Sequence, residues 1–472
     1  MAKVILAGFN LDADVVEALL RGETETPLTP ETLSAAYARI SRDPRPVPEL
    51  RREAIADISL ARQRNERIVF GFGHRSVAEH AVLNLDVLDA SRLAIEAIES
   101  HRLASYTEKS QRYIRIGEDF IVPNEVLAAG LEGPFRVFMG KCFEHYRNLC
   151  RGLVAAGVQE RAAYEDARYC LPLAVTGQLG MTVNARSLEY MVLSLLAHPL
   201  AECQDIGAQL LRAGLRVVPS LMRVTRPGPY HLERGKDVDN AVMRLWSTPG
   251  PGPVSTSDVT LVRFTPDGDI AVLAALAQPA LGCSHAQAVA MVSALTKEGR
   301  LSLYRTATAS LGPHDALPRE LEHATLTYDM VMSAAAFAQF KRHRMTSLSS
   351  MPYDPGLDIT VPPSLVAANL SGRLLAAASD AFAMWQALGG TRSPAATYAL
   401  LNAHRRRVLV TLNLRELHHM SRLREDAAAQ WDIRGLVSAM TRRAREAFPV
   451  CASTLGGKDA FLARASGNRN SE

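Results

Sequence analysis

The sequence predicts an α/β protein of the α+β type that contains two copies of one domain. The chain has 472 residues, enough for two or three domains that each bury their own core. Short apolar segments with strand-like alternation occur among longer segments of helical periodicity. Several short motifs also occur twice, in the same order, on either side of a Pro/Gly-rich segment.

The composition is that of a soluble globular protein, with 47% hydrophobic and 22% charged residues. The formal net charge of +4 is small for this length, so we expect no nucleic acid and no membrane as a partner, whereas local basic sites for small anions are compatible with it. No apolar run approaches the roughly 18 residues of a membrane-spanning helix, and the first one is too short for a signal peptide. The six cysteines form no C-x-x-C pair, which favours reduced thiols. We therefore expect a cytoplasmic enzyme without a metal site.

The first part of the chain predicts a strand at residues 1–8, followed by helices. Thr29-Pro30-Glu31 has the cap, the proline and the acid that are typical of a helix N-terminus. The segment 71–76 predicts a turn, and its glycine spacing does not fit a dinucleotide-binding loop. A half-buried strand is expected within 79–87, and a helix over 90–104 that ends in a cationic segment, as the helix dipole favours.

Further helices are predicted up to Pro219. One long amphipathic helix is expected from about 133 to 165. A second helix opens at Val183-Asn184 and places apolar residues at i, i+3, i+4 and i+7 from Leu188. A third runs through Ile206 and ends before the proline.

Internal duplication is the main organising feature. After the Pro/Gly-rich segment the motifs return in order, and the spacing falls steadily from 243 to 227 residues, as loop deletions produce. We assign residues 1–223 to a first repeat, 224–256 to a linker, 257–455 to a second repeat and 456–472 to a polar tail. The matched pairs are Glu79-His80 with Glu322-His323, His101-Arg102 with His343-Arg344, Val122-Pro123 with Val361-Pro362, Asn184–Leu188 with Asn413–Leu417, and Asp205-Ile206 with Asp432-Ile433.

The stretch Ser100–Tyr113 reads SHRLASYTEKSQRY and is too cationic for a core segment. It resembles the signature of flavin-dependent thymidylate synthases, R-H-R followed by S-x-N-E-x-S-x-R-Y. Supporting matches are Glu79-His80, Arg168-x-x-Leu171-Pro172 and Asn184–Leu188 in the first copy, and Gln339-x-x-Arg342-His343-Arg344 and Arg424 followed by Gln430–Arg434 in the second.

The resemblance implies helices around a mixed β-sheet in each copy, assembled in the family as a tetramer with sites shared between subunits. It also implies FAD-dependent methylation of dUMP to dTMP, with methylenetetrahydrofolate and NADPH as co-substrates and with sites shared between the two repeats. Because one chain carries two copies, a homodimer would give a four-lobed assembly.

The residue types suit these ligands. Histidine and arginine donors position a pyrophosphate and a reduced flavin ring, and a serine with a forked arginine suits a phosphate dianion. By resemblance the flavin contacts are Glu79, His101, Arg102, Asn184 and Arg186 in the first copy, and Glu322, Arg342, His343, Arg344, Asn413 and Arg415 in the second. The nucleotide contacts are Glu108, Ser110, Arg112, Arg168 and Gln339, and Arg424 is the catalytic residue that polarises the uracil ring.

Both copies depart from the family pattern. The first has Ser100, Thr107 and Leu195 where the family has Arg, Asn and the polarising Arg. The second has Ser350, Pro352 and Thr397 in place of the Glu, Ser and Arg that contact the nucleotide. Neither half holds a full site, so we expect Gln339 and Arg342 of one copy to face Glu108, Ser110 and Arg112 of the other. That combination still lacks Arg168 and Arg424.

Alternatives remain open for several residues and for the function. His80 and His323 are read either as functional or as core histidines. Arg405–Arg407 is read as an ion-paired face rather than a nucleic-acid site, and His418-His419 as part of a cofactor wall rather than a metal site. Besides thymidylate synthesis, the sequence allows a related flavin-dependent modification of another pyrimidine nucleotide, or a catalytically degenerate protein that binds FAD or nucleotide.

Overall fold

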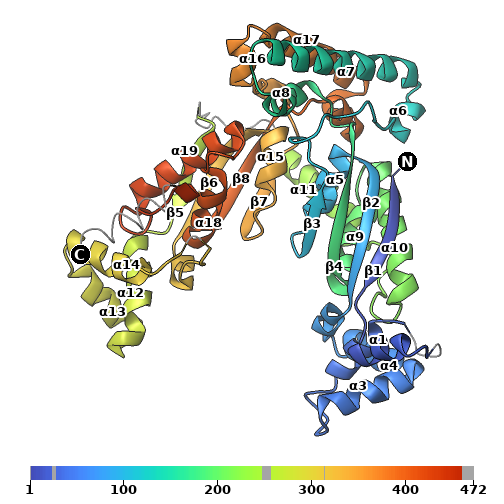
Figure 1. Cartoon of the computed structure of the whole chain (residues 1–472), viewed down its shortest axis with the longest axis vertical. Helices are drawn as coiled ribbons and strands as arrows, with labels where there is room; N and C mark the ends of the chain where they lie inside the picture. Colours follow the sequence, from blue (N-terminus) through green and yellow to red (C-terminus); the bar gives the residue numbers. More distant parts are fainter. Residues whose placement is uncertain (1, 24–27, 247–256, 313, 460–472) are drawn as a thin grey trace. The chain divides into compact units, whose positions relative to one another are not determined.

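The computed structural model describes residues 2–23, 28–246, 257–312 and 314–459. The chain forms two compact units, and each is described by itself (Figure 1). Unit 1 comprises Met1–Pro251 and Ser364–Leu401, and unit 2 comprises Gly252–Pro363 and Asn402–Glu472. No helix in these described ranges combines the length and the apolar character that a bilayer crossing requires.

Unit 1 is built on a four-stranded sheet in the order β1-β2-β4-β3. Its strands are β1 (Lys3–Phe9), β2 (Val82–Ser91), β3 (Ala104–Glu108) and β4 (Thr176–Asn184). Leu83, Leu85 and Val87 of β2 alternate toward the core, as the sequence pattern predicts.

Three helices pack against this sheet: α5 (Arg92–Glu99), α9 (Ala185–Leu196) and α10 (Ala201–Val217) (Figure 1). Between β1 and β2 the chain inserts α1 (Ala13–Leu20), α2 (Glu31–Tyr37), α3 (Val47–Ala56) and α4 (Ile58–Glu66). The insert has a small core of its own, formed by Ala35, Ala36, Leu50, Ala54 and Ala61.

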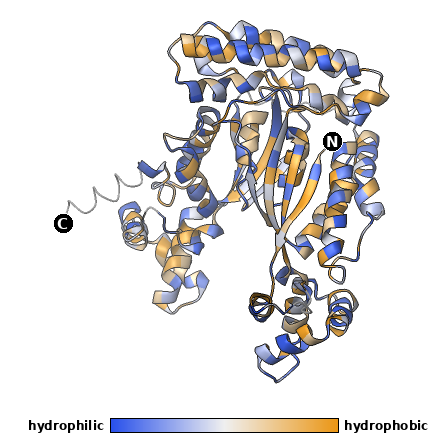
Figure 2. Cartoon of the chain, turned by 45° about the vertical axis from the view of Figure 1, so that its right-hand side comes forward, coloured by the Kyte–Doolittle hydropathy of each residue, from blue (hydrophilic) through white to orange (hydrophobic). Residues whose placement is uncertain are grey.

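A segment of the second repeat completes unit 1. Helices α6 (Asn124–Ala128), α7 (Glu132–Ala155) and α8 (Glu160–Ala167) come from the first repeat, and α16 (Pro363–Ala367) and α17 (Ser371–Ala387) come from the second. Helices α7 and α17 pack together, and hydrophobic and hydrophilic residues alternate along both (Figure 2). Backbone hydrogen bonds from Leu173 N to Leu400 O (2.8 Å) and from Ala174 N to Tyr398 O (3.1 Å) join the loops that follow these helices.

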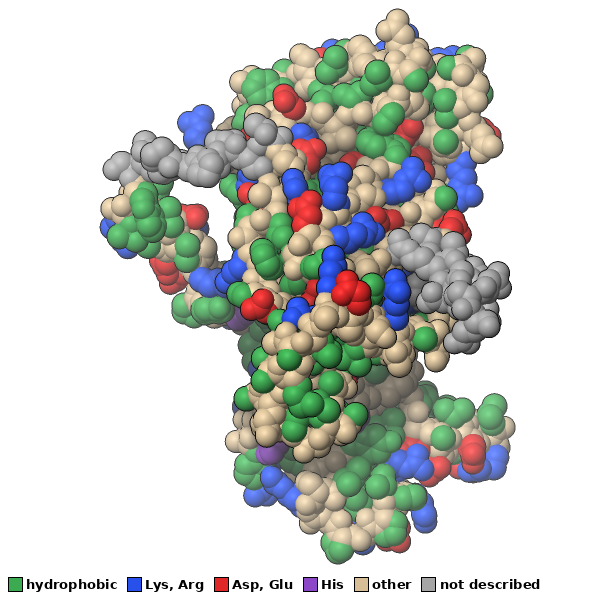
Figure 3. All heavy atoms as spheres, turned by 90° about the vertical axis from the view of Figure 1, so that its left-hand side faces the viewer, with side chains coloured by type: hydrophobic (Ala, Val, Ile, Leu, Met, Phe, Trp, Pro, Cys, Tyr) green, Lys and Arg blue, Asp and Glu red, His purple; other side chains and the backbone are tan. Residues whose placement is uncertain are grey.

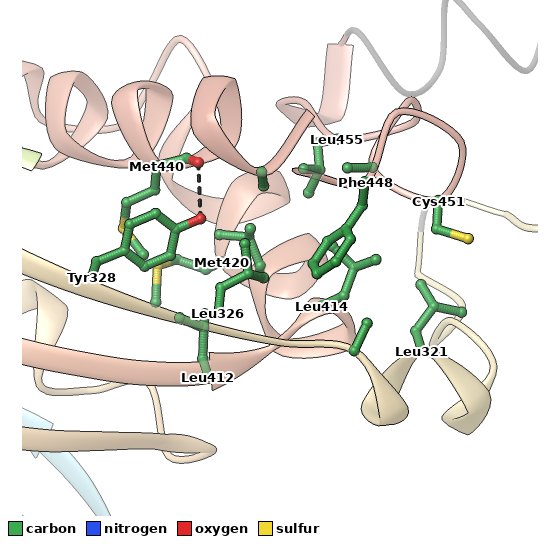
Figure 4. Packing of buried hydrophobic residues seen from close by; sticks show 14 of the residues in the cluster. Leu321, Leu326, Tyr328, Leu412, Leu414, Met420, Met440, Phe448, Cys451 and Leu455 are labelled. Carbon is green, nitrogen blue, oxygen red and sulfur yellow. Dashed lines mark hydrogen bonds between the residues drawn. The ribbon is translucent and has the colours of Figure 1, made fainter. Parts of the chain in front are cut away.

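Unit 2 repeats the sheet of unit 1, in the order β5-β6-β8-β7. Its strands are β5 (Val259–Phe264), β6 (Thr325–Ser333), β7 (Thr346–Ser350) and β8 (Arg405–Asn413). Its helices are α12 (Gly268–Leu281), α13 (His285–Ser293), α14 (Lys297–Thr308), α15 (Ala334–Phe340), α18 (Leu414–Arg424) and α19 (Trp431–Ala447). In its core the hydroxyl of Tyr328 donates to the carbonyl oxygen of Met440 at 3.0 Å, among leucine and phenylalanine side chains (Figure 4).

The predicted fold class is confirmed, with corrections in detail. Every ladder in the described residues is antiparallel, so neither sheet is mixed. The long helix expected over 133–165 is two helices, because Gly157 has a φ of 87° and ends α7. The helix expected over 90–104 ends at Glu99, and the chain turns into β3.

The repeat and linker boundaries stay predictions. Within the predicted linker, residues Pro229–Leu245 form α11, which buries none of its residues. Residues 247–256 of the linker and 460–472 of the predicted tail lie outside the described residues.

Candidate functional site

Both units place an asparagine and an arginine at the same point, where a central strand becomes a helix. Asn184 ends β4 and caps α9, and its side-chain oxygen accepts from the backbone N–H of Ser187 at 2.8 Å. Asn413 ends β8 and accepts in the same way from the N–H of Glu416 at 2.8 Å. A side-chain acceptor at this position satisfies a helix N–H that has no partner in its own helix. Arg186 and Arg415 therefore occupy equivalent positions in the first turns of α9 and α18.

Each of these arginines pairs with a glutamate that was also predicted as a flavin contact. Nη1 of Arg186 lies 2.6 Å from Oε1 of Glu79, and both side chains are about half exposed. Nη1 of Arg415 lies 3.1 Å from Oε1 of Glu322, and Nε of Arg415 donates to the carbonyl of Leu317 at 2.8 Å. A hydrogen bond from Arg319 is the main cause that lowers the pKa of Glu322. The predicted flavin contacts Glu79 with Arg186, and Glu322 with Arg415, are thus brought together.

A cavity of about 440 Å³ lies at the second of these pairs, in unit 2. Its charged lining contains three cations and three carboxylates. The cationic groups fit the anionic pyrophosphate of a flavin dinucleotide. Polar and charged residues of the lining include Asp315, Glu322, Asn413, Arg415, Glu416, His419, Arg422 and Lys458.

The Arg-His-Arg segment of unit 2 directs its histidine inward. His343 is 3% exposed, whereas Arg342 and Arg344 are exposed. Nε of Arg424 donates to Nε2 of His343 at 3.1 Å, and Nδ1 of His343 lies 3.4 Å from Oε1 of Glu416. Burial is the main cause that lowers the pKa of His343.

Gln339, the predicted nucleotide contact of unit 2, and Arg424, the predicted catalytic residue, both belong to the cluster around His343. A terminal nitrogen of Arg424, Nη2, donates to the carbonyl of Gln339 at 3.4 Å. Gln339 is buried at the end of α15, and its side-chain nitrogen donates to Gln430, which caps α19. His343, Gln339 and Arg424 were predicted for three different ligand contacts, and the structure places them in contact with one another.

The equivalent segment of unit 1 is similar at the histidine. Nδ1 of His101 lies 3.1 Å from the carbonyl of Ile98, and burial lowers the pKa of His101. Its ring packs edge-on against Tyr190 with centroids 5.6 Å apart, as the ring of His343 packs against His419 at 6.1 Å. Arg102 is partly exposed.

The predicted nucleotide segment of unit 1 is held by charged partners, Arg92 and Glu165, that the sequence did not reveal. Glu108 at the end of β3 pairs with Arg92, and both side chains are more than nine-tenths buried. Nε of Arg112 donates to Oε1 of Glu165 at 3.0 Å. The hydroxyl of Ser110 accepts from the backbone N–H of Arg112 at 3.1 Å.

Arg168 joins this group through Glu165 as well. Its Nε donates to the carbonyl of Glu165 at 3.1 Å, and burial lowers the pKa of the guanidinium. Arg112, Arg168 and Ser110 therefore form one cluster. The carboxylate of Glu165 pairs with Arg112 across 53 positions of sequence, so no spacing rule could have identified it.

Unit 1 has no arginine at the position of Arg424. Leu195 stands there, is 1% exposed and packs against α10. A Cβ on Gly207 would lie 2.9 Å from Cβ of Leu195, so the two helices are in close contact at this residue. This position belongs to the core of unit 1.

The alternatives left open for the two histidines and for the run of three arginines are decided by exposure and by ion pairing. His80 and His323 are exposed, so the reading as core histidines is wrong. Arg405 pairs with Asp258 and Arg407 with Asp329, as expected for an ion-paired face. On the face drawn in Figure 3, basic and acidic side chains lie interspersed.

The paired histidines face different surroundings. His418 is buried against the carbonyl of Cys451, while His419 lines the cavity of unit 2. Within the described ranges no group of His, Cys, Asp and Glu side chains could hold a metal ion.

Comparisons with known proteins agree with this duplicated arrangement. The family model described as thymidylate synthase complementing protein matches residues 24–220 and 260–450. The flavin-dependent thymidylate synthase of Geobacter sulfurreducens is 31% identical over 205 residues, which cover 42% of this chain and 83% of that protein. The enzyme of the same name from Pyrococcus abyssi is 32% identical over 177 residues, which cover 35% of this chain and 69% of that protein.

Solved structures that match part of this chain include the flavin-dependent thymidylate synthase ThyX from Helicobacter pylori complexed with FAD and dUMP. It is 19% identical, with a TM-score of 0.30, and the match covers 45% of this chain and 93% of that chain. The UMP/dUMP methylase PolB from Streptomyces cacaoi, bound with 5-Br dUMP, is 20% identical with a TM-score of 0.36, covering 47% and 93%.

Proposed function

Because the chain belongs to the family of flavin-dependent thymidylate synthases, we propose that it methylates dUMP to dTMP. The carbon donor is methylenetetrahydrofolate and the reductant is NADPH. FAD, when bound, supplies the redox chemistry that neither side chains nor nucleotide provide. The activity requires side chains of both repeats, since neither carries the full set that the resemblance implies.

The observation that supports flavin binding best is the matched set Asn184, Arg186 and Glu79 in unit 1 and Asn413, Arg415 and Glu322 in unit 2. Each arginine is paired with a partly exposed carboxylate, and in unit 2 it lines a cavity with two further cations. Arginine with a planar fork of donors suits a pyrophosphate. We assign FAD contacts to these residues, together with His101, Arg102, Arg342, His343 and Arg344.

The cluster of Ser110, Arg112 and Arg168 supports recognition of a nucleotide monophosphate. A hydroxyl and two guanidinium groups are a suitable set of donors for a phosphate dianion. Glu108 and Gln339 complete the proposed nucleotide contacts. Arg424 stabilises the negative charge that develops on the uracil ring as C5 becomes nucleophilic.

The second candidate is a flavin-dependent modification of another pyrimidine nucleotide. It is favoured because most of the changes fall around the proposed nucleotide site, at Thr107, Leu195, Ser350, Pro352 and Thr397, whereas Ser100 is the one change at a proposed flavin contact. The third candidate, a degenerate protein that binds FAD or nucleotide, predicts binding without turnover. We further propose a homodimer, which light scattering tests, and a cytoplasmic location, which fits the six free cysteines.

The test is to incubate purified protein with FAD, NADPH and methylenetetrahydrofolate and with either dUMP or UMP, and to identify products by mass spectrometry. We expect dTMP from dUMP. A product from UMP alone would favour the second candidate, and flavin binding with no product from any pyrimidine nucleotide would favour the third.

A further inference from the structure

We propose that Glu416 and His343 are positioning residues that orient the guanidinium of Arg424 toward the nucleotide. This inference rests on the proposed function, in which Arg424 faces the uracil ring. It assigns His343 a role through Arg424, in addition to the flavin contact that the resemblance implies.

The hydrogen bond between Arg424 and His343 decides the state of the imidazole. Nε of an arginine only donates, so Nε2 of His343, which lies 3.1 Å away, carries no proton. The neutral ring then has its proton on Nδ1. That nitrogen lies 3.4 Å from Oε1 of Glu416.

Glu416 is placed to hold this tautomer. Its side chain is 8% exposed, and Oε1 accepts no hydrogen bond within the described residues, so its contact with Nδ1 of His343 is an electrostatic one at 3.4 Å. A buried carboxylate that faces an N–H is stabilised by it and polarises the ring, which makes Nε2 a better acceptor. Carboxylate, imidazole and guanidinium therefore form a line of interactions on one side of α18.

A second contact fixes the rotation of the guanidinium. Nη2 of Arg424 donates to the carbonyl of Gln339, at the end of α15. With Nε bound to His343 and Nη2 bound to this carbonyl, the plane of the group is defined at two of its nitrogens. A guanidinium held in this way loses little entropy when it meets a substrate, which favours catalysis.

The first copy provides an internal comparison. Ser187 stands at the position of Glu416 and Leu195 at the position of Arg424. His101 is retained, but its Nδ1 faces the carbonyl of Ile98. The carboxylate and the arginine are thus absent together where the histidine remains, as expected if the carboxylate serves the arginine.

The charged and titratable groups that face His343 are Glu416, Arg424 and His419 of α18, while α15 contributes the uncharged ring of Phe340. Glu416 raises the pKa of His343, whereas Arg424 and His419 lower it. Removal of the Glu416 charge should therefore shift the protonation of His343 to lower pH. Protonated His343 cannot accept from Arg424.

The experiment compares Glu416→Gln, Glu416→Asp, Arg424→Lys and the double variant E416Q/R424K by kcat, KM and pH profile. Ser187→Ala, at the matched position of the first copy, is the control. We expect E416Q to lower kcat on the order of tenfold with a smaller effect on KM, and to shift the acidic limb of the profile to lower pH. E416D should restore part of the rate, and E416Q should change kcat less than about twofold in the R424K background.

Equal effects of E416Q in the two backgrounds, or an unmoved acidic limb, would overturn the proposal. A second measurement does not depend on activity. In [¹⁵N]histidine-labelled protein, with the signal of His343 assigned from His343→Gln, NMR should show a proton on Nδ1 and none on Nε2. If no nucleotide is methylated, the proposed function fails and the kinetic comparison cannot be made. The NMR spectrum then tests the positioning role by itself, and a protonated Nε2 would overturn it.

Discussion

Nη1 of Arg415 lies 3.1 Å from Oε1 of Glu322, on the helix that Asn413 caps. The same pair occurs in unit 1 between Arg186 and Glu79. Two copies that have lost different nucleotide contacts thus keep the same arrangement at the proposed flavin contacts. This retained pair is the basis of the first prediction.

Replacement of Arg415 by alanine should weaken FAD binding without unfolding the protein. The ion pair is partly exposed, so its loss costs about 0–1 kcal/mol of stability. Loss of a charge-assisted hydrogen bond to a phosphate costs about 1.5–3 kcal/mol, which is a tenfold or larger increase in Kd. Titration of flavin fluorescence measures it, with Arg443→Ala, from the exposed pair Arg443–Glu446, as the control. An unchanged affinity for FAD in R415A would contradict the assignment.

Glu108 and Ser110 should respond differently to substitution, although both are proposed nucleotide contacts. Glu108→Gln removes the carboxylate that faces the buried Arg92 and should lower the free energy of unfolding by about 3–5 kcal/mol. Ser110→Ala removes one hydroxyl and should cost about 1 kcal/mol or less. Urea denaturation separates the two variants. S110A is therefore the variant for nucleotide titrations, where we expect weaker binding of dUMP; equal stability of the two variants would show that the Arg92 pair is unimportant.

Leu195→Arg, which restores the residue of the family pattern, should destabilise the chain rather than create a second site. The side chain is buried against α10 beside Gly207. A guanidinium group at this position would be shielded from water and would lose its hydration. We expect a loss of about 3–5 kcal/mol, against less than about 1.5 kcal/mol for Leu195→Met. Thermal unfolding followed by circular dichroism checks it. A stable L195R protein with increased activity would contradict the core placement.

Stability should fall as the pH decreases below about 6.5. Burial lowers the pKa values of His101 and His343 from their ordinary value of 6.5, so the unfolded chain binds more protons below that pH. The stabilising contribution of each neutral ring is therefore complete above pH 6.5 and is lost as the pH falls toward the folded-state pKa. Unfolding free energies measured between pH 7.5 and 5.5 test this. His343→Gln should flatten the dependence, whereas the exposed His285→Gln should not; parallel curves for H343Q and the parent protein would contradict it.

The sequence predicted features that are local or repeated. The start of the helix at Asn184 was predicted from its local sequence, because helix capping depends on adjacent residues. The arginines two residues after each asparagine, and Glu79 and Glu322, were identified from repeated motifs, whereas the ion pairs between them are known only from the structure. The repeat was found from motif order, and the two sheets have the same strand order. The family and the fold class inferred from these motifs are confirmed.

What the sequence missed depends on contacts between distant segments. Glu416 meets His343 across 73 positions of sequence, and Arg92 meets Glu108 from another element, so no spacing rule identifies them. The assignment of Ser364–Leu401 to unit 1 also follows only from tertiary packing. The strand β3 was missed because it has only five residues and begins five positions after the last residue of α5, within the segment predicted as helix.

The central claim is that the chain methylates a pyrimidine nucleotide with FAD, and its most direct test is one anaerobic absorbance experiment. Purified protein saturated with FAD is reduced with NADPH, and dUMP and methylenetetrahydrofolate are then added together or singly. We predict that the absorbance band of oxidised flavin returns only when both substrates are present, with dTMP formed in equal amount. Protein that binds no FAD, or bound flavin that remains reduced with both substrates present, would contradict the account.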